Sequence, residues 1–245
     1  MTLGAIKDST LLRKIGKRMG MQEKRLGIHY SFGPTLDINT NPKNPIIGNR
    51  SYGSSPDRVI RQALAIMKGH QEAGILTSGK HFPGHGSSTT DTHKEFTDVS
   101  SSWIVEELFP YHKMMIEDKV DAIMTSHVVN SKIDDSMLPA TLSERSINKL
   151  LRGFMDYKGV VFSDDMQMGA ITKNFGLKES IIYAINAGVD VLIFSNNQLY
   201  KDQVKPDEVI SIIEDGVRNG EISLLSINES FKRIHNLKKK INLIN

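Results

Sequence analysis

The 245-residue chain contains no cysteine, a single tryptophan and few aromatic residues (7%). Without cysteine, neither a disulfide framework nor a thiolate metal site can form. No apolar run approaches the roughly 20 residues of a membrane-spanning helix, and basic residues do not interleave with aromatic ones as a nucleic-acid surface requires. Because the N-terminus also lacks a signal-peptide pattern, we expect a cytoplasmic protein with neither membrane nor nucleic-acid partners.

The rest of the composition is that of an ordinary globular domain, 39% hydrophobic and 24% charged. The net charge is +3, and the lysine run at residues 238–240 reads as a solvated helix face. We find no internal repeat and no low-complexity linker. Residues 1–245 are therefore predicted to form one domain.

Short apolar runs alternate with amphipathic stretches along the chain. Five strands are predicted at residues 28–32, 74–77, 121–127, 159–165 and 189–194. Helices are predicted after a capping Asp8, at residues 55–74, 104–119 and 177–187, after a capping Ser143, and in two closing segments, the last opened by a Ser226/Glu229 capping box. Nearly continuous apolar strands separated by helices indicate a parallel α/β sheet, of the (β/α) TIM-barrel type but with five strands where a closed barrel has eight.

The side chains most suited to catalysis lie close together in residues 80–93 (Lys-His-Phe-Pro-Gly-His-Gly-Ser-Ser-Thr-Thr-Asp-Thr-His), which contain lysine, histidine and aspartate. They follow an apolar strand and are predicted to form a loop, shaped by glycine and proline and rich in histidine, whose pKa lies near neutrality. Asp37, Lys80 with His81, His127 and Asp164 all fall at the C-terminal ends of predicted strands. That end is the active-site face of a β/α barrel, so we interpret the segment as part of an active site.

Several of these segments resemble family 3 glycoside hydrolases, in particular their β-N-acetylhexosaminidase branch. The resemblance is carried by residues 80–86 with the Asp-Thr-His of residues 91–93, and by the Asn/Pro-rich loop at 37–53. It is carried further by Phe-Ser-Asp-Asp-Met at 162–166 and Ala-Gly-Val-Asp at 187–190, and it runs from about residue 8 to 240.

The resemblance implies a retaining hydrolase that releases terminal N-acetylhexosamine from an amino-sugar glycoside or a peptidoglycan fragment, without cofactor or metal. It makes Asp164 the nucleophile, in preference to Asp165, and His93 the acid/base, oriented by Asp91. It also implies substrate-binding roles for Arg50, Lys80, His81 and Asp37. For Asp37 the alternative is a turn aspartate that bonds nearby backbone amides. The loop between Gly84 and His93 is expected to be mobile.

The family's Asp-Gln-Glu-Gly-Gly segment and the first barrel strands find no counterpart here, which predicts a barrel shortened at its N-terminus. Such a barrel exposes two strand edges, which invite association, so a homo-oligomer is one expectation. Two other functions stay open. One is a non-catalytic or vestigial sugar-binding protein; the other is a metal-dependent hydrolase with ligands drawn from His81, His85, Asp91, His93, His127 and Asp164.

Overall fold

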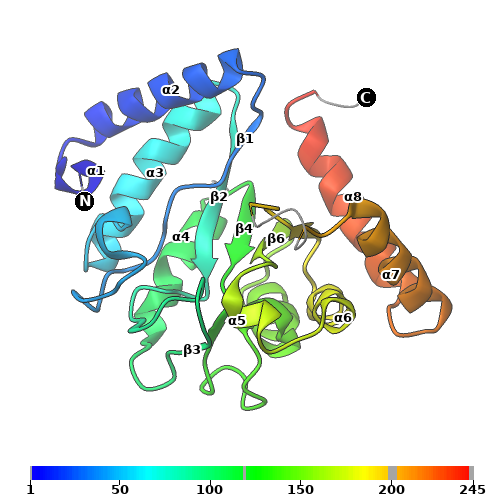
Figure 1. Cartoon of the computed structure of the whole chain (residues 1–245). Helices are drawn as coiled ribbons and strands as arrows, with labels where there is room; N and C mark the ends of the chain where they lie inside the picture. The colour runs from blue at the N-terminus through cyan, green and yellow to red at the C-terminus, as the bar shows by residue number, and fades with distance from the viewer. Residues whose placement is uncertain (1, 118–119, 198–202, 243–245) are drawn as a thin grey trace.

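A five-stranded parallel sheet forms the centre of the computed structural model, which describes residues 2–117, 120–197 and 203–242 (Figure 1). Its strands follow one another in chain order: β1 (Tyr30–Ser31), β2 (Leu76–Phe82), β4 (Ala122–Thr125), β6 (Val160–Asp165) and β7 (Val191–Ile193). Because the order never reverses, the sheet winds in one direction, as in a β/α barrel and not as in a doubly wound fold. In the described part of the chain, β1 and β7 pair on one side only. The predicted incomplete barrel is confirmed.

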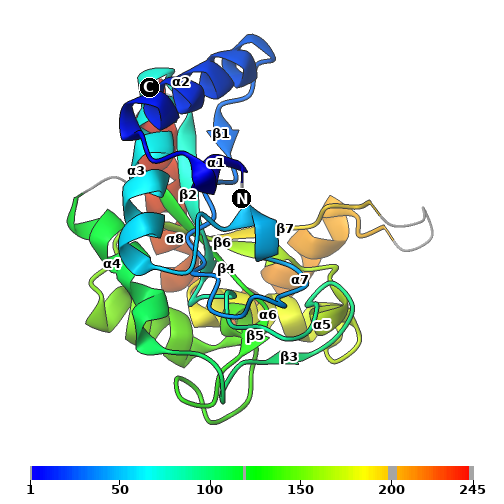
Figure 2. The ribbon, with the colours of Figure 1, turned by 90° about the vertical axis from the view of Figure 1, so that its left-hand side faces the viewer.

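Helices connect the strands and pack against the sheet. The longer ones are α2 (Ser9–Arg25), α3 (Pro56–Glu72), α4 (Phe109–Ile116), the π-helix η4 (Arg145–Phe154), α6 (Leu177–Ala187), α7 (Pro206–Arg218) and α8 (Leu224–Lys239). Single-turn elements are α1 (Thr2–Ala5), η1 (Gly48–Arg50), η2 (Val105–Leu108), η3 (Ala140–Leu142) and α5 (Gly169–Thr172). Both views show α2 running alongside α3 (Figures 1 and 2).

Local signals placed several helix ends correctly. The Asp8 carboxylate accepts hydrogen bonds from the amides of Thr10 (2.8 Å) and Leu11 (3.2 Å), and it caps α2 as predicted. Helix α6 has the predicted bounds and ends where Gly188 adopts a left-handed conformation (φ +107°), which suits glycine. α3 begins at Pro56 as expected, although the Ser55 hydroxyl makes no capping bond.

Other expectations were wrong. Strand β2 extends to Phe82, so Lys80 and His81 lie in the strand and not in a loop after it, because β2 pairs with β4 up to Thr125. The helix expected at residues 104–119 is the turn η2 followed by α4; residues 118–119 lie outside the described residues. α8 begins two residues before Ser226, so there is no capping box, and Glu229 pairs with Lys232 instead.

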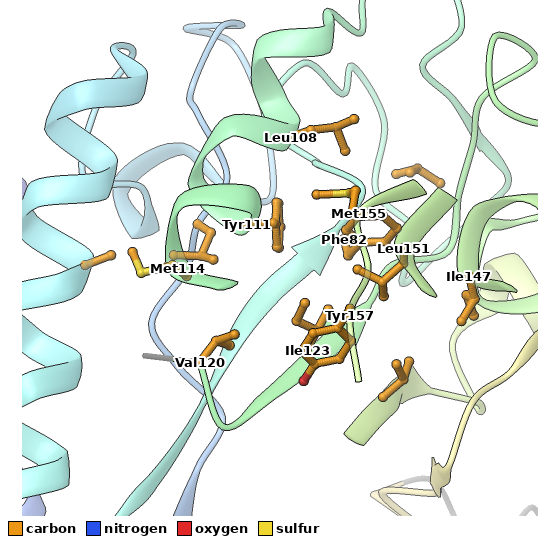
Figure 3. Close-up of a cluster of buried hydrophobic side chains, with 14 of the residues drawn as sticks. Phe82, Leu108, Tyr111, Met114, Val120, Ile123, Ile147, Leu151, Met155 and Tyr157 are labelled. Atoms are coloured by element: carbon orange, nitrogen blue, oxygen red, sulfur yellow. The ribbon is translucent and has the colours of Figure 1, made fainter. Parts of the chain in front are cut away.

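The sheet buries apolar side chains on both faces. On the outer face, Phe82 and Ile123 pack against Tyr111 and Met114 of α4 and Leu151 of η4 (Figure 3). Phe154, the last residue of η4, is 86% exposed and takes no part in this layer. The outer layer holds the strands together and is fully buried, so it positions the strand ends rigidly.

On the inner face, Leu76, Ala122 and Val160 pack against Leu237 of α8. Between this face and helices α7 and α8 lies an apolar groove of about 910 Å³. Its lining includes Phe32 (45% exposed) and Phe231 (66% exposed). In a closed barrel this space is filled by layers of side chains. No helix in the described residues has both the length and the apolar character needed to cross a membrane.

A buried aspartate links the sheet to the helices around it. Asp190, at the start of β7, accepts hydrogen bonds at Oδ2 from Arg152 of η4 (2.7 Å) and from the Val161 amide (2.8 Å). Its Oδ1 accepts from Arg233 (2.9 Å) and Ser230 (2.6 Å), both on α8. Its side chain is 0% exposed. One carboxylate therefore connects η4, β6 and α8.

Replacing this carboxylate tests how much the network stabilises the fold. Asp190→Ala leaves two arginines without their buried partner, so we expect the free energy of unfolding to fall by about 3–5 kcal/mol. Chemical denaturation measures the loss. The control is Asp135→Ala, which breaks an exposed pair with Arg145 and should cost less than about 1 kcal/mol. Equal losses in the two variants would contradict the assignment.

Candidate active site

The C-terminal ends of the strands meet at one edge of the sheet, and the predicted side chains are found there. The segment after β1 runs beside β2, where Thr35 forms a bridge with Lys80. This pairing brings Asp37 next to His81. β6 ends in Asp164 and Asp165, and the chain after β4 carries His127. The sheet therefore gathers residues that are far apart in sequence.

Asp37 lies at the base of the site and is 0% exposed. Its Oδ2 is 2.7 Å from Nδ1 of His81, and its Oδ1 accepts from the amides of His81 (3.2 Å) and His85 (2.8 Å). Burial by itself would raise the pKa of Asp37, but His81 and His85 outweigh burial and hold this pKa below its usual range. The substrate-binding role expected for Asp37 stays a prediction. Its carboxylate is enclosed by protein donors, and the amides that it bonds are distant in sequence.

His81 is held in one tautomer by its two neighbours. Its Nε2 lies 3.2 Å from a guanidinium nitrogen of Arg50. Arginine can only donate, so Nε2 accepts and the ring proton is on Nδ1, donated to Asp37. Arg50 is thereby fixed at the rim of the site, with its side chain exposed. Arg50, His81 and Asp37 form one chain of contacts, as three of the predicted binding residues.

Lys80 is half-buried in the same site. Burial lowers the pKa of Lys80, and the positive charge of Arg50 lowers it further. Asp164 and Asp37 act in the opposite direction. Lys80 therefore lies within electrostatic range of the candidate nucleophile.

The two neighbouring aspartates differ in how they are bonded. Asp165 accepts from the amides of Gln167 and Ser195 (both 3.1 Å) and from the Ser195 hydroxyl (2.5 Å), which occupies both oxygens. Asp164 accepts only from the Asp165 amide (2.9 Å at Oδ1) among the described residues. Its second oxygen is thus available to a ligand. The geometry favours Asp164 over Asp165, in the direction that the sequence indicated.

Asp164 is also the more strongly stabilised anion. Burial would raise the pKa of Asp164, but the nearby His81, His127 and Lys80 side chains and the hydrogen bond from the Asp165 amide bring this pKa below its usual value. His127 is itself fully buried, with Nε2 donating to the Asp165 carbonyl (2.9 Å). Burial lowers the pKa of His127. His127 is therefore a packed residue that supports Asp165 from the interior.

Asp91 and His93 form the predicted dyad on an exposed loop. Nδ1 of His93 is 2.8 Å from Oδ1 of Asp91, which also accepts the His93 amide (2.9 Å). The ring is 59% exposed, and its Nε2 makes no hydrogen bond with the described residues. The His93 carbonyl accepts from the Gly169 amide (3.0 Å), so the dyad rests on α5.

The segment that precedes the dyad is held by several side-chain hydrogen bonds, and the mobility expected for it stays a prediction. The Asn44 side chain donates to the carbonyls of His85 (2.8 Å) and Gly86 (3.0 Å), and Asn41 donates to Ser88 (2.7 Å). A Cβ at Gly86 would overlap the Ile38 carbonyl. Glycine is required there for close backbone approach, not for flexibility. The Asn-rich loop was noted in the sequence, but it was not predicted that its asparagine side chains hold the histidine loop in place.

His85 joins the two ends of this loop. Its Nδ1 lies 2.7 Å from the Ser88 hydroxyl and its Nε2 lies 3.1 Å from the Thr92 hydroxyl. Burial, assisted by His81, lowers the pKa of His85 to about 4, so the ring is neutral at pH 7. His85 is therefore a buried structural residue that holds Thr92, the residue before His93, in place.

A pocket of about 620 Å³ opens beside His93. Its lining is partly apolar, with Phe175 and Phe194, and partly polar, with Gln167 and Lys173. Lys173 donates to the Lys94 carbonyl (2.6 Å) and has no carboxylate partner among the described residues. His93 is one of the lining residues, so the pocket adjoins the dyad.

No group of three or more His, Asp or Glu side chains among the described residues is arranged to hold a metal ion. The ring nitrogens of His81 and His85, two of the histidines that might have served, are engaged in other contacts. His81 bonds Asp37 and Arg50, and His85 bonds two hydroxyls. The geometry thus gives no support to the metal-dependent alternative.

The sheet, the strand-end acids and the histidine loop together define an incomplete β/α-barrel domain with polar side chains gathered at the carboxyl ends of its strands. The N-terminal domain of glycosyl hydrolase family 3 matches residues 1–237, and the chain belongs to this family. The resemblance read from residues 80–93 is therefore confirmed.

Relatives with known names point to one branch. Beta-hexosaminidase A of Pseudoalteromonas piscicida is 30% identical over 242 residues, covering 93% of this chain and 40% of that protein. A beta-hexosaminidase of Tolumonas auensis is 38% identical over 174 residues, covering 70% of this chain and 51% of that protein. A solved family 3 beta-N-acetylglucosaminidase from Paenibacillus sp. superposes with a TM-score of 0.90 at 37% identity, over 98% of this chain and 45% of that one. The chain spans about half the length of these curated relatives.

The rigidity of the histidine loop can be tested at Gly86. Gly86→Ala pushes a methyl group into the Ile38 carbonyl, so we expect the free energy of unfolding to fall by at least about 2 kcal/mol. Gly176→Ala is the matched control, because its Cβ would meet no atom within 4 Å. That change should cost less than about 1 kcal/mol in thermal or chemical unfolding. A tolerated Gly86→Ala would show that the loop yields easily.

Proposed function

We propose that the chain is the catalytic barrel region of a retaining glycoside hydrolase that releases terminal β-linked N-acetylhexosamine, such as N-acetylglucosamine. The observation that carries the proposal is Asp164. It is an ionised carboxylate at the end of β6, with one oxygen free of protein partners and three cationic or cation-forming side chains around it. A carboxylate in this state can attack an anomeric carbon to form a covalent glycosyl-enzyme.

His93 supplies the proton transfers in this scheme. Nδ1–H donates to Asp91, which leaves Nε2 as the atom that carries the transferred proton. In the first step Nε2–H protonates the departing oxygen while Asp164 forms the bond to the sugar. In the second step Nε2 accepts a proton from water, which attacks the anomeric carbon and releases Asp164.

In the proposed complex the sugar is held by donors near Asp164. Arg50 and Lys80 donate charge-assisted hydrogen bonds to hydroxyl and N-acetyl oxygens. His81 keeps Arg50 in place through the 3.2 Å contact and contributes its ring edge. Asp37 acts through His81, since it has no oxygen free for the sugar.

The group that leaves occupies the pocket beside His93. A general acid must reach the glycosidic oxygen, so the leaving group lies on the side where that acid stands. The pocket that contains His93 offers apolar walls for a ring and the Lys173 ammonium for an anionic substituent. Peptidoglycan fragments combine both features and are the substrate class that we propose.

Hydrolysis of p-nitrophenyl β-N-acetylglucosaminide tests the nucleophile. Asp164→Ala should abolish turnover, because no covalent intermediate can form, while Asp98→Asn, at an exposed acid of the short strand β3 (Thr97–Asp98), should leave it unchanged. The first-formed product should be the β-anomer by NMR. Turnover that survives in Asp164→Ala would eliminate this mechanism. A folded chain without any turnover that still binds N-acetylglucosamine would favour the non-catalytic alternative.

The acid role of His93 predicts a dependence on the leaving group. His93→Ala should lower kcat/KM about 10²- to 10⁴-fold for a poor leaving group and much less for an activated aryl group, which departs without protonation. The two substrates are compared in one spectrophotometric or chromatographic assay. Asp91→Asn should show the same pattern more weakly. An identical loss on both substrates would argue that His93 binds the sugar and does not protonate the leaving group.

A further inference from the structure

Glu107 is a buried acid that the mechanism above does not use. It belongs to η2 and is 0% exposed. Its Oε2 accepts from the Gly86 amide (3.1 Å), and a Cβ at Gly84 would touch its side chain. Gly84 has φ +119°, so glycine and the Glu107 side chain fit each other at this turn. The carboxyl therefore lies directly beneath the turn at residues 84–86.

The same turn is held from its other side by Asp37. The His85 amide donates to Asp37 and the next amide, that of Gly86, donates to Glu107. From this turn the His85 ring reaches the Thr92 hydroxyl, and the Thr92 and His93 carbonyls accept from the Ala170 and Gly169 amides of α5. A continuous series of contacts therefore connects Glu107, through the turn and His85, to Thr92, which lies between the two residues of the dyad.

We propose that Glu107 is a positioning residue of the active site: its carboxyl fixes the turn at residues 84–86, and through His85 and Thr92 it fixes the placement of His93. It touches neither the sugar site nor the dyad itself. Its effect on His93 rests on the proposed function, whereas its effect on the loop does not.

The surroundings of Glu107 favour its neutral form. Burial raises the pKa of Glu107 to about 7, and Asp37, on the segment after β1, adds a like charge. The Ser87 hydroxyl and the Gly86 amide, on the loop, and the Ile104 backbone oppose the rise. Tyr111, on α4, contributes a buried hydroxyl and no positive charge. The Ser87 hydroxyl is near enough to Glu107 to affect its pKa, but neither this hydroxyl nor Oε1 of Glu107 makes a hydrogen bond of good geometry with the described residues, and both are buried.

This arrangement makes the hold on the loop sensitive to pH. A carboxyl whose pKa is raised in the folded state binds its proton more tightly there than in the unfolded chain. The stability that it contributes is complete below the unfolded value of 4.5 and is lost as pH rises through about 7. The loss corresponds to a change on the order of a hundredfold in the unfolding equilibrium constant. The ionised form places an unpaired charge beneath the turn, so the loop should open more readily at alkaline pH.

Glu107→Gln keeps the shape and removes the titration. Its amide oxygen can accept from Gly86, and its NH₂ can donate to the unpaired Ser87 hydroxyl. We therefore expect the variant to be more stable than wild type at pH 8 and no more stable at pH 4.5. The equilibrium constants are compared at each pH, because His85 and His127, with lowered pKa values, add a pH dependence of opposite sign to both proteins. Glu106→Gln, the same change on the neighbouring residue, is the control.

Hydrogen exchange of the peptide that covers residues 83–93 reports positioning without requiring activity. Corrected for intrinsic rates, exchange should accelerate in wild type between pH 5.5 and 8 and should remain level in Glu107→Gln. If the enzyme is active, the alkaline fall of kcat should move to higher pH in the variant, with KM nearly unchanged. This kcat readout depends on the proposed function, and the exchange and stability readouts do not.

Two results would overturn the proposal. One is a Glu107→Gln protein that loses more stability relative to wild type at pH 8 than at pH 4.5, because an ionised carboxylate would then be what the turn requires. The other is a stability difference that does not change with pH, together with unchanged exchange of residues 83–93. Either result would make Glu107 an ordinary buried acceptor with no influence on the loop.

Discussion

The site depends on the buried carboxylate of Asp37. This one group bonds the His81 ring and the amides of His81 and His85, so it joins the end of β2 to the loop that leads to the dyad. A buried anion needs several donors to remain charged, and the donors that satisfy Asp37 are those whose positions matter for the site. The hydrogen bonds that stabilise the Asp37 carboxylate are therefore the same ones that position His81 and the histidine loop.

The residues of the proposed site are of two kinds, buried residues that support it and exposed residues that can reach a substrate. Asp37, His85 and His127 are buried and bonded, whereas Arg50 and His93 reach the surface from these supports. Asp164 lies between them, with one oxygen fixed by the Asp165 amide. This arrangement suits a site in which a fixed nucleophile must meet an acid/base delivered by a loop. The sheet fixes the positions of the strand ends that carry these residues, because its outer face is packed against α4 and η4.

Much of the architecture could be predicted from the chain itself. Parallel strands buried on both faces leave long apolar runs, so the five strands of the central sheet and the barrel type were recognised, whereas the short pair β3 (Thr97–Asp98) and β5 (Val128–Val129) was not. Capping by Asp8 and the bounds of α6 followed from local chemistry. The end of β2 was missed because Lys80 and His81 are poor strand residues that pairing with β4 and the Asp37 bond hold in place. The Ser226/Glu229 motif misled because tertiary packing of α8 sets where that helix begins.

The sequence by itself determined the family, the strand-end positions of the functional groups and the adjacency of Asp91 and His93, because these depend on local order and spacing. Only the tertiary structure decided that Asp37 lies behind His81, that Asp165 is fully bonded while Asp164 is not, and that Glu107 lies beneath the histidine loop. Each of these depends on contacts between segments far apart in the chain. Burial and hydrogen-bond partners at such contacts are set by how the strands and helices pack, which no local pattern of residues records.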